Sequence, residues 1–519
     1  MNKSVEKILI YVIFSYLSIP ILIFLLGWIK LYISIPLALL LITGIWSYLK
    51  DTYSEIRNED TTLSMWKLIS VSILAFVWVY LSGIGGYSNQ DWDHNFRNAV
   101  FADMINYSWP IYYKFSPAID LDFLAGNYAG LNYYLTFWLP AALIGKAYGT
   151  NAANAALLVW SFIGILLALF LLFRLLNYKM IVLSTIVFIL WSGLDVLGKL
   201  IIQRHIVGLS EAIEMYFYYS YTSFTTDLFN VFNQVVPTWI ITLWVLNYKK
   251  KIPILPIGML FAYAPFPFIV LVLFYAINFC IDVYRQHKTS KLFSLIIDLF
   301  GKINSVSVVA TVLAIGFPYL AFYHAHNSVL STRFFPERLV GKPWGENIEL
   351  IMNYFITFVV EAGLFFALIR WLTPTIYLKN KQTYWIAFWL LLLIPACESG
   401  VWQDFATRGS IPVLTVLLVL TLLAIRELYH QKHYFPKMAV MAVVLLLSWV
   451  TPFWLLIKAP ALEGTPKIRT SVGSFGQPRV SETTNTEGVL SSLPNFYSTN
   501  PQHKFFYRLL AKRTVPVAE

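Results

Sequence analysis

Long apolar runs, each able to cross a lipid bilayer, follow one another along most of this chain. A run of this kind must form a helix, because the hydrocarbon core has no water to satisfy open backbone groups. The runs lie near residues 8–27, 32–49, 66–85, 153–175, 180–196, 236–247, 252–263, 266–280, 305–323, 349–372, 384–396, 411–425 and 438–457. The sequence therefore predicts an all-α, polytopic transmembrane helix bundle of about 11–13 spans, occupying residues 1–457.

The composition agrees with a membrane protein and argues against a nucleic-acid-binding one. Of the 519 residues, 58% are hydrophobic and only 13% are charged, about half the charged share of a typical soluble protein. The net charge of +11 is spread over short basic loops, which mark the cytoplasmic side of membrane proteins and contact anionic lipids. Because no basic patch lies on a soluble module, we expect membrane lipids as partners and no nucleic acid.

Residues 131–148 decide the topology. This segment is apolar and about long enough to cross, but Pro140 lies in its middle. If it crossed, the basic runs at 174–179, 249–251 and 285–291 would face outward. If it lies on the outer surface, these runs share the cytoplasm with the N-terminus, as the positive-inside rule favours. We therefore predict an interfacial helix here, a cytoplasmic N-terminus, and an extracytoplasmic C-terminal tail at 458–519.

With this topology, the polar residues gather on the extracytoplasmic side, while the cytoplasmic loops are short and basic. The first outward loop, residues 86–152, carries an acidic motif and a helix with an apolar face. The candidate site residues in the outward segments are Asp91, Asp93, His94, Arg97, Gln234, Arg333, Arg338, Asp404 and Arg408. Loops on a rigid scaffold are common places for binding and catalysis.

Two aspartates, Asp91 and Asp93, follow directly after a predicted span. A partly desolvated carboxylate at this depth can act as a general base. The pair can also hold a divalent cation such as Mg²⁺ or Mn²⁺. A structural alternative is an ion pair, because Asp93 and Arg97 have the i, i+4 spacing of helical neighbours. Arg408, just before a span, is placed either to bind a phosphate or to anchor the helix at the lipid headgroups.

Four segments resemble the GT-C class of polytopic membrane glycosyltransferases. They are the acidic motif Asp91-Trp92-Asp93-His94 after a span, the interfacial segment 129–149, the Asn233-Gln234-Val235-Val236-Pro237 run before the break at 263–266, and residues 404–412. The resemblance covers the chain up to about residue 457. Two extra spans precede the acidic loop, and Val235 stands where relatives often carry histidine beside the glutamine.

The resemblance implies transfer of a sugar from a polyprenyl-phosphate carrier to a glycan, lipid or protein acceptor on the non-cytoplasmic face, with inversion. Asp91 or Asp93 would be the base. Arg408, Arg333 and Arg338 would stabilise the phosphate leaving group, with His94, Arg97, Gln234 and Asp404 as further binding residues. It also implies a multi-pass protein of the bacterial plasma membrane.

Two other functions remain open from the sequence. A polysaccharide polymerase or ligase would depend on arginines or histidines of the late outward loops and would not need the aspartate motif. A transporter of lipid-linked glycans would use charged residues inside the spans, of which Asp195 and Glu361 are the main ones.

Overall fold

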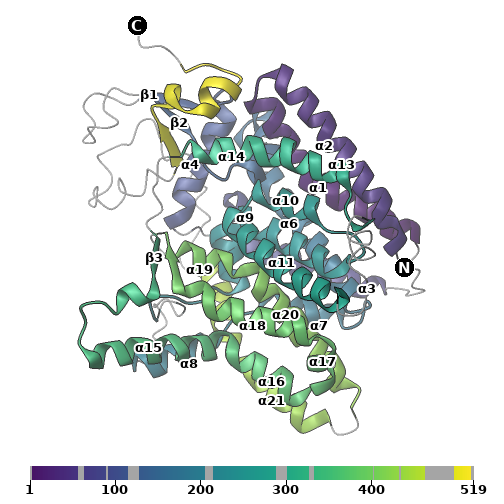
Figure 1. The fold of residues 1–519 in the computed structure, drawn as a ribbon, viewed down its shortest axis with the longest axis vertical. Helices are drawn as coiled ribbons and strands as arrows, with labels where there is room; N and C mark the ends of the chain where they lie inside the picture. The colour runs from purple at the N-terminus through teal and green to yellow at the C-terminus, as the bar shows by residue number, and fades with distance from the viewer. Residues whose placement is uncertain are drawn as a thin grey trace.

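The computed structural model describes residues 3–56, 64–88, 90, 92–114, 128–204, 214, 216–287, 301–326, 332–400, 403–431, 434–461 and 496–515. Most of these residues are helical (Figure 1). In this part of the chain, eight helices are long and apolar enough to cross a membrane, or nine if one pair bent by 42° counts as a single span. The predicted all-α, multi-pass bundle is therefore confirmed.

The candidate spans have the following bounds. They are α1 (Lys3–Trp28), α2 with its 3-10 extension (Leu31–Glu55), α6 (Thr150–Leu175), α9 (Phe224–Asn247), α11 (Pro265–His287), α13 to α14 (Ser305–His324), α15 to α16 (Trp344–Leu372) and α19 to α20 (Asp404–Tyr429). The bent pair is formed by α21 (Tyr434–Ser448) and α22 (Val450–Ala461).

Several predicted spans are shorter helices. These are α3 (Met65–Leu81), α7 (Ile181–Ile189), α10 (Ile254–Phe261) and α18 (Lys381–Leu393). A helix rises about 1.5 Å per residue, so the eight residues of α10 cover only about 12 Å of a core about 30 Å thick. The number of full-length spans among the described residues is thus below the predicted 11–13, because breaks divide several apolar runs.

The segment that decided the topology is too short to cross. Its helical part, α5 (Leu139–Tyr148), has ten residues, about 15 Å. Gly149, with a φ of +87°, then turns the chain into α6. The other helix of the first outward loop, α4 (Trp92–Asn106), packs against α5. Its apolar residues Val100 and Met104 are buried in protein, so this helix covers the bundle rather than presenting an apolar face to lipid.

A buried ion pair joins the N-terminus to the ends of two long helices. Arg174, in the last turn of α6, donates from Nε to Glu6 of α1 at 2.7 Å. The guanidinium also donates to Asn247, at the end of α9, and lies over the ring of Tyr248 at 4.2 Å. The start of α1 and the ends of α6 and α9 therefore lie at one end of the bundle, as expected if residues 131–148 do not cross.

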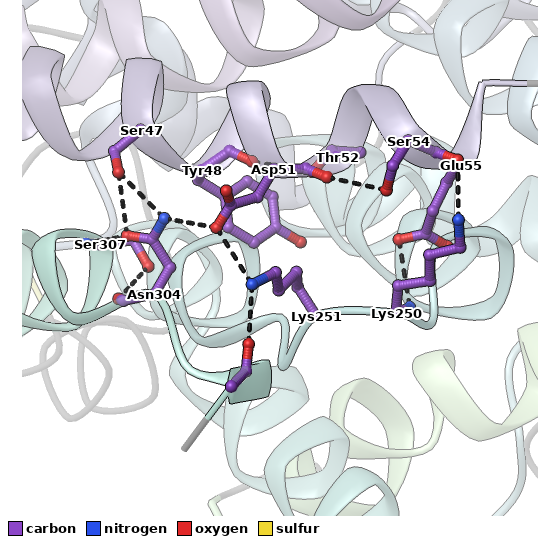
Figure 2. Close-up of polar contacts among 11 residues, drawn as sticks. Ser47, Tyr48, Asp51, Thr52, Ser54, Glu55, Lys250, Lys251, Asn304 and Ser307 are labelled. Atoms are coloured by element: carbon purple, nitrogen blue, oxygen red, sulfur yellow. Dashed lines mark hydrogen bonds and ion pairs between the residues drawn. The ribbon is translucent and has the colours of Figure 1, made fainter. Parts of the chain in front are cut away.

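Polar contacts at the end of α2 hold the basic run 249–251 at the end of the bundle where Glu6 and Arg174 lie (Figure 2). Asp51 forms an ion pair with Lys251 at 3.4 Å and accepts a hydrogen bond from Asn304, just before α13. Glu55 accepts hydrogen bonds from the backbone N–H groups of Lys249 and Lys250. The basic run 249–251 is thus fixed beside the N-terminal half of the bundle.

The C-terminal segment folds at the opposite end (Figure 1). Strand β5 (Tyr497–Thr499) extends a small antiparallel sheet made by β1 (Tyr112–Lys114) and β2 (Tyr128–Leu131). Nearby, the backbone N–H of Lys512 donates to the carbonyl of Trp28, the last residue of α1. Trp28 lies 22 residues after Glu6 in α1, so this contact is about 33 Å from Glu6 along the helix. The part of the predicted tail from 496 to 515 is therefore packed on the bundle.

Candidate functional site

The first half of α9 carries a row of buried polar side chains. Ser223 caps the helix by accepting a hydrogen bond from the backbone N–H of Thr226, and the helix is interrupted at Val231, where φ is −135°. Asn233 and Gln234 follow this break and are buried. Within the described ranges of the chain, neither the side-chain oxygen nor the side-chain nitrogen of Gln234 has a hydrogen-bond partner. Because unpartnered buried amides are costly, this stretch is a candidate for ligand contact.

Helix α4 brings His94 to the same region. His94 is buried, and its ring lies against that of Phe232 at 6.4 Å, next to Asn233 and Gln234 in α9. Arg97, one turn after Asp93, is buried too. Asp91 and the side chain of Asp93 lie outside the described residues. The structure does confirm that Asp93 and Arg97 are on one helix, as the i, i+4 alternative requires.

The charge of Arg408 acts on Tyr134, which lies beside Asn233 of α9. Arg408 lies in α19 (Asp404–Gly409) and forms an ion pair with Asp404 at 2.9 Å, both side chains being about one-fifth exposed. Burial raises the pKa of Tyr134, and the nearby Arg408 guanidinium opposes this shift. The carbonyl of Tyr134 accepts a hydrogen bond from Asn233 at 3.4 Å. Arg408 also attracts Asp227, in the first turn of α9.

The other two predicted arginines lie on a neighbouring hairpin. Strand β3 (Thr332–Phe334) pairs with β4 (Cys397–Ser399), and the short helix η5 (Phe335–Arg338) follows β3. Arg338 forms an ion pair with Glu398 and lies over the ring of Tyr218 at 4.4 Å. Arg333 is exposed and donates to the carbonyl of Glu337. Like Arg408, both arginines have contacts within the protein.

One loop places the hairpin beside α19. Gly400 directly follows β4 and has a φ of +88°, in the left-handed region that favours glycine. A Cβ at this position would collide with the side chain of Asp404. The sequence therefore needs glycine here to hold Asp404, and with it the Asp404–Arg408 pair, against the hairpin.

The structure also places three acidic residues near one another that the sequence did not predict to be neighbours. It consists of Asp195 at the start of α8 (Asp195–Gln203), Glu214 before α9, and Glu361 within α15 to α16. All three side chains are buried. The available sequence signal was acidic residues within or beside apolar runs, which are costly in a membrane protein unless used or paired.

Burial controls the titration of Glu214. Burial, and next the nearby Asp195, raise the pKa of this carboxyl from 4.5 to about 8, although hydrogen bonds from Thr226 and the backbone N–H of Ser223 oppose the shift. The folded protein thus holds this proton more tightly than the unfolded chain. The stability due to this proton is fully present below the unfolded pKa and is lost as the pH rises towards 8.

We therefore expect Glu214→Gln to reduce the pH dependence of stability. The variant should lose a slope of at most about 1.4 kcal/mol per pH unit between about pH 5 and pH 8. The measurement is the unfolding midpoint of both proteins at several pH values in this range. Glu346→Gln, on the exposed first turn of α15, is the control and should keep the wild-type slope. If stability depends on pH with the same slope in Glu214→Gln and in wild type, the raised pKa does not belong to Glu214.

A metal site is not formed by the side chains that the structure describes. In this part of the chain, no group of three His, Cys, Asp or Glu residues is arranged to hold an ion. The predicted divalent cation would depend on Asp91 and Asp93, whose side chains are outside the described part. It therefore stays a prediction.

Comparison with known proteins adds no family to this picture. No protein-family model, curated protein or solved structure matches the chain. The fold and the geometry of the site are consequently the basis of the functional argument.

Proposed function

We propose that this protein is a membrane glycosyltransferase of the GT-C type. It would move a sugar from a polyprenyl-phosphate donor to a glycan, lipid or protein acceptor. The proposal further includes a bacterial plasma membrane, a cytoplasmic N-terminus and a site on the extracytoplasmic side. The observation that supports it is that His94 of α4 lies beside Phe232, next to Asn233 and Gln234 in α9, while the charge of Arg408 acts on Tyr134, whose carbonyl accepts a hydrogen bond from Asn233.

The depth of Arg408 supports a lipid-linked phosphate as the donor group. Arg408 lies in the first turns of the candidate span Asp404–Tyr429, so its guanidinium is at the level where a span meets the headgroups. A donor with a polyprenyl chain stays in the bilayer and presents its phosphate at that level. Arginine binds phosphate oxygens through two parallel hydrogen bonds, and such charge-assisted bonds are strong when partly shielded from water.

The proposed reaction assigns one task to each group. The acceptor hydroxyl oxygen forms a bond to the anomeric carbon while the bond from that carbon to the phosphate oxygen breaks. The phosphate leaves with the electron pair, stabilised by Arg408. Asp91 or Asp93 takes the proton of the acceptor hydroxyl. His94, Arg97, Gln234 and Asp404 would bind or orient the two substrates.

The test is transfer of labelled sugar from a panel of polyprenyl-phosphate sugars by the purified full-length protein in lipid vesicles, with acceptors of the three classes. We expect transfer by wild type and a loss of about 10²–10³-fold in Arg408→Gln, as for removal of one transition-state charge contact. Arg333→Gln is the matched control, because its side chain is exposed, and should remain within a few-fold of wild type. Loss in Arg333→Gln with Arg408→Gln unaffected would favour the polymerase or ligase alternative.

A transporter of lipid-linked glycans is the second candidate. The observation in its favour is that Asp195 and Glu361, far apart in sequence, meet in the interior of the bundle. Movement of a fluorescent lipid-linked glycan across vesicles containing the protein, without sugar transfer, would support this function instead.

A further inference from the structure

Asp195 and Glu361 place two carboxyl groups together without enough donors for both. Asp195 Oδ2 accepts a hydrogen bond from Ser192 at 2.8 Å, and Glu361 Oε1 accepts one from Tyr216. The remaining oxygens, Asp195 Oδ1 and Glu361 Oε2, are fully buried, and none of the residues that the structure describes donates a hydrogen bond to them. The two side chains are nevertheless hydrogen-bonding neighbours of each other.

Two carboxylate oxygens that face each other in a buried site can be satisfied by a single proton between them. Without it, two lone pairs would repel each other in a low-dielectric interior, and each unpaired charge would carry a large desolvation cost. With it, the pair forms one strong O–H···O bond and carries one negative charge rather than two.

The backbone around the pair is built for close approach. A Cβ at Gly193 would collide with the Glu361 carboxylate, and a Cβ at Gly198 would collide with the Tyr216 ring. The backbone N–H of Leu194 donates to the carbonyl of Val360 at 3.2 Å. The turn before α8 is therefore hydrogen-bonded directly to the π-helical segment η6 (Val359–Gly363), which carries Glu361.

The other ionisable groups around the pair are mostly acids and tyrosines. Burial raises the pKa of Asp195, and the hydrogen bond from Ser192 opposes this shift. The charged or titratable groups that face the pair or lie on the elements around it are Glu214, Tyr216, Tyr219, Tyr221, Asp227 and, one turn along α8, the buried Lys199.

We propose that Asp195 and Glu361 form a proton-binding site in the interior of the bundle, holding one shared proton at neutral pH. Glu214 extends the site towards the outer end, because its carboxylate accepts hydrogen bonds from Thr226 and Ser223 at the start of α9. Asp227, which interacts with Arg408, is the next acid along this helix. The proposal does not depend on the transferase function.

Infrared spectroscopy of the full-length protein in lipid vesicles tests the proposal. A protonated carboxylic acid has a carbonyl band that a carboxylate lacks. We expect this band in the wild type at pH 7, and a loss of the absorbance of one carboxylic acid in the double variant Asp195→Asn, Glu361→Gln. Glu214→Gln calibrates the absorbance of a single protonated acid.

Glu6→Gln is the matched control, because Glu6 and Glu361 are both 2% exposed while Glu6 is paired with Arg174. It should leave the band unchanged. A double variant with the wild-type band, or loss of the band in Glu6→Gln, would overturn the proposal. If the double variant does not accumulate, the difference between the wild-type spectra at pH 6 and pH 7 decides. The part of the carbonyl band that remains in Glu214→Gln should not change between these pH values if Asp195 and Glu361 share a proton. A loss of this part of the band between pH 6 and pH 7 would contradict the proposal.

Discussion

Substituting asparagine for Asp91 or Asp93 is expected to lower sugar transfer by about 10²–10⁴-fold, the usual contribution of a general base. Asparagine keeps the size of the side chain but cannot accept the proton of the acceptor hydroxyl. Because one carboxylate suffices for this step, one of the two variants should account for nearly all of the loss. Initial rates of transfer with saturating donor, measured over a range of pH, identify that position.

The structure supplies a control on the same helix. Asp103 is buried in α4 and accepts a hydrogen bond from Tyr113 at 2.8 Å, a structural role about 15 Å along the helix from Asp93. Asp103→Asn should stay within a few-fold of wild type once corrected for the amount of folded protein. If both Asp91→Asn and Asp93→Asn transfer sugar at the wild-type rate, the aspartates are not the base, and the late-loop arginines become the leading candidates.

The helices were predictable because apolar runs of this length have few alternatives in a bilayer. The lengths of individual spans were not. The break at 263–266 was predicted, but the run 252–263 before it forms an α10 of only eight residues. Hydropathy marks where an apolar run lies and does not fix how much of it is helical. The positive-inside rule, by contrast, correctly grouped Arg174 and Lys249–Lys251 with the N-terminal end.

The candidate site was predictable only in part. His94, Gln234 and Arg408 were proposed from local motifs, and their roles stay predictions; the structure adds that His94 lies beside Phe232, two positions before Gln234. The ion pair between Arg338 and Glu398 joins residues 60 positions apart, and no local pattern reveals it. The small β1–β2–β5 sheet likewise depends on a strand from the C-terminal segment, where three-residue strands have no recognisable periodicity.

The acidic cluster shows the same limit more strongly. Asp195 and Glu361 each stand out as acids in apolar surroundings, but a single sequence does not say that they meet. Tyr216 donates to Glu361 across 145 positions, and no local pattern reveals this contact either.

Breaking the Glu6–Arg174 pair should have the largest effect on stability. Both side chains are 2% exposed, and Arg174 has further hydrogen bonds to Asn247 and to the carbonyl of Glu55. Removing one partner of a buried pair leaves the other charge without compensation, which typically costs about 3–5 kcal/mol. We therefore expect Arg174→Met and Glu6→Gln to lower the free energy of unfolding by this amount, measured from unfolding midpoints in detergent.

The Asp51–Lys251 pair at the same end of the bundle provides the comparison (Figure 2). Its side chains are 33% and 26% exposed, so water already solvates both charges, and Lys251→Met should cost only about 0–1 kcal/mol. The double variant Glu6→Gln, Arg174→Met should regain much of the stability lost in Arg174→Met, because no unpaired charge remains. If Arg174→Met and Lys251→Met lower the free energy of unfolding equally, the Glu6–Arg174 pair does not hold these helix ends together. A large difference between them would show that burial of the pair, rather than its charge alone, ties the N-terminus to α6 and α9.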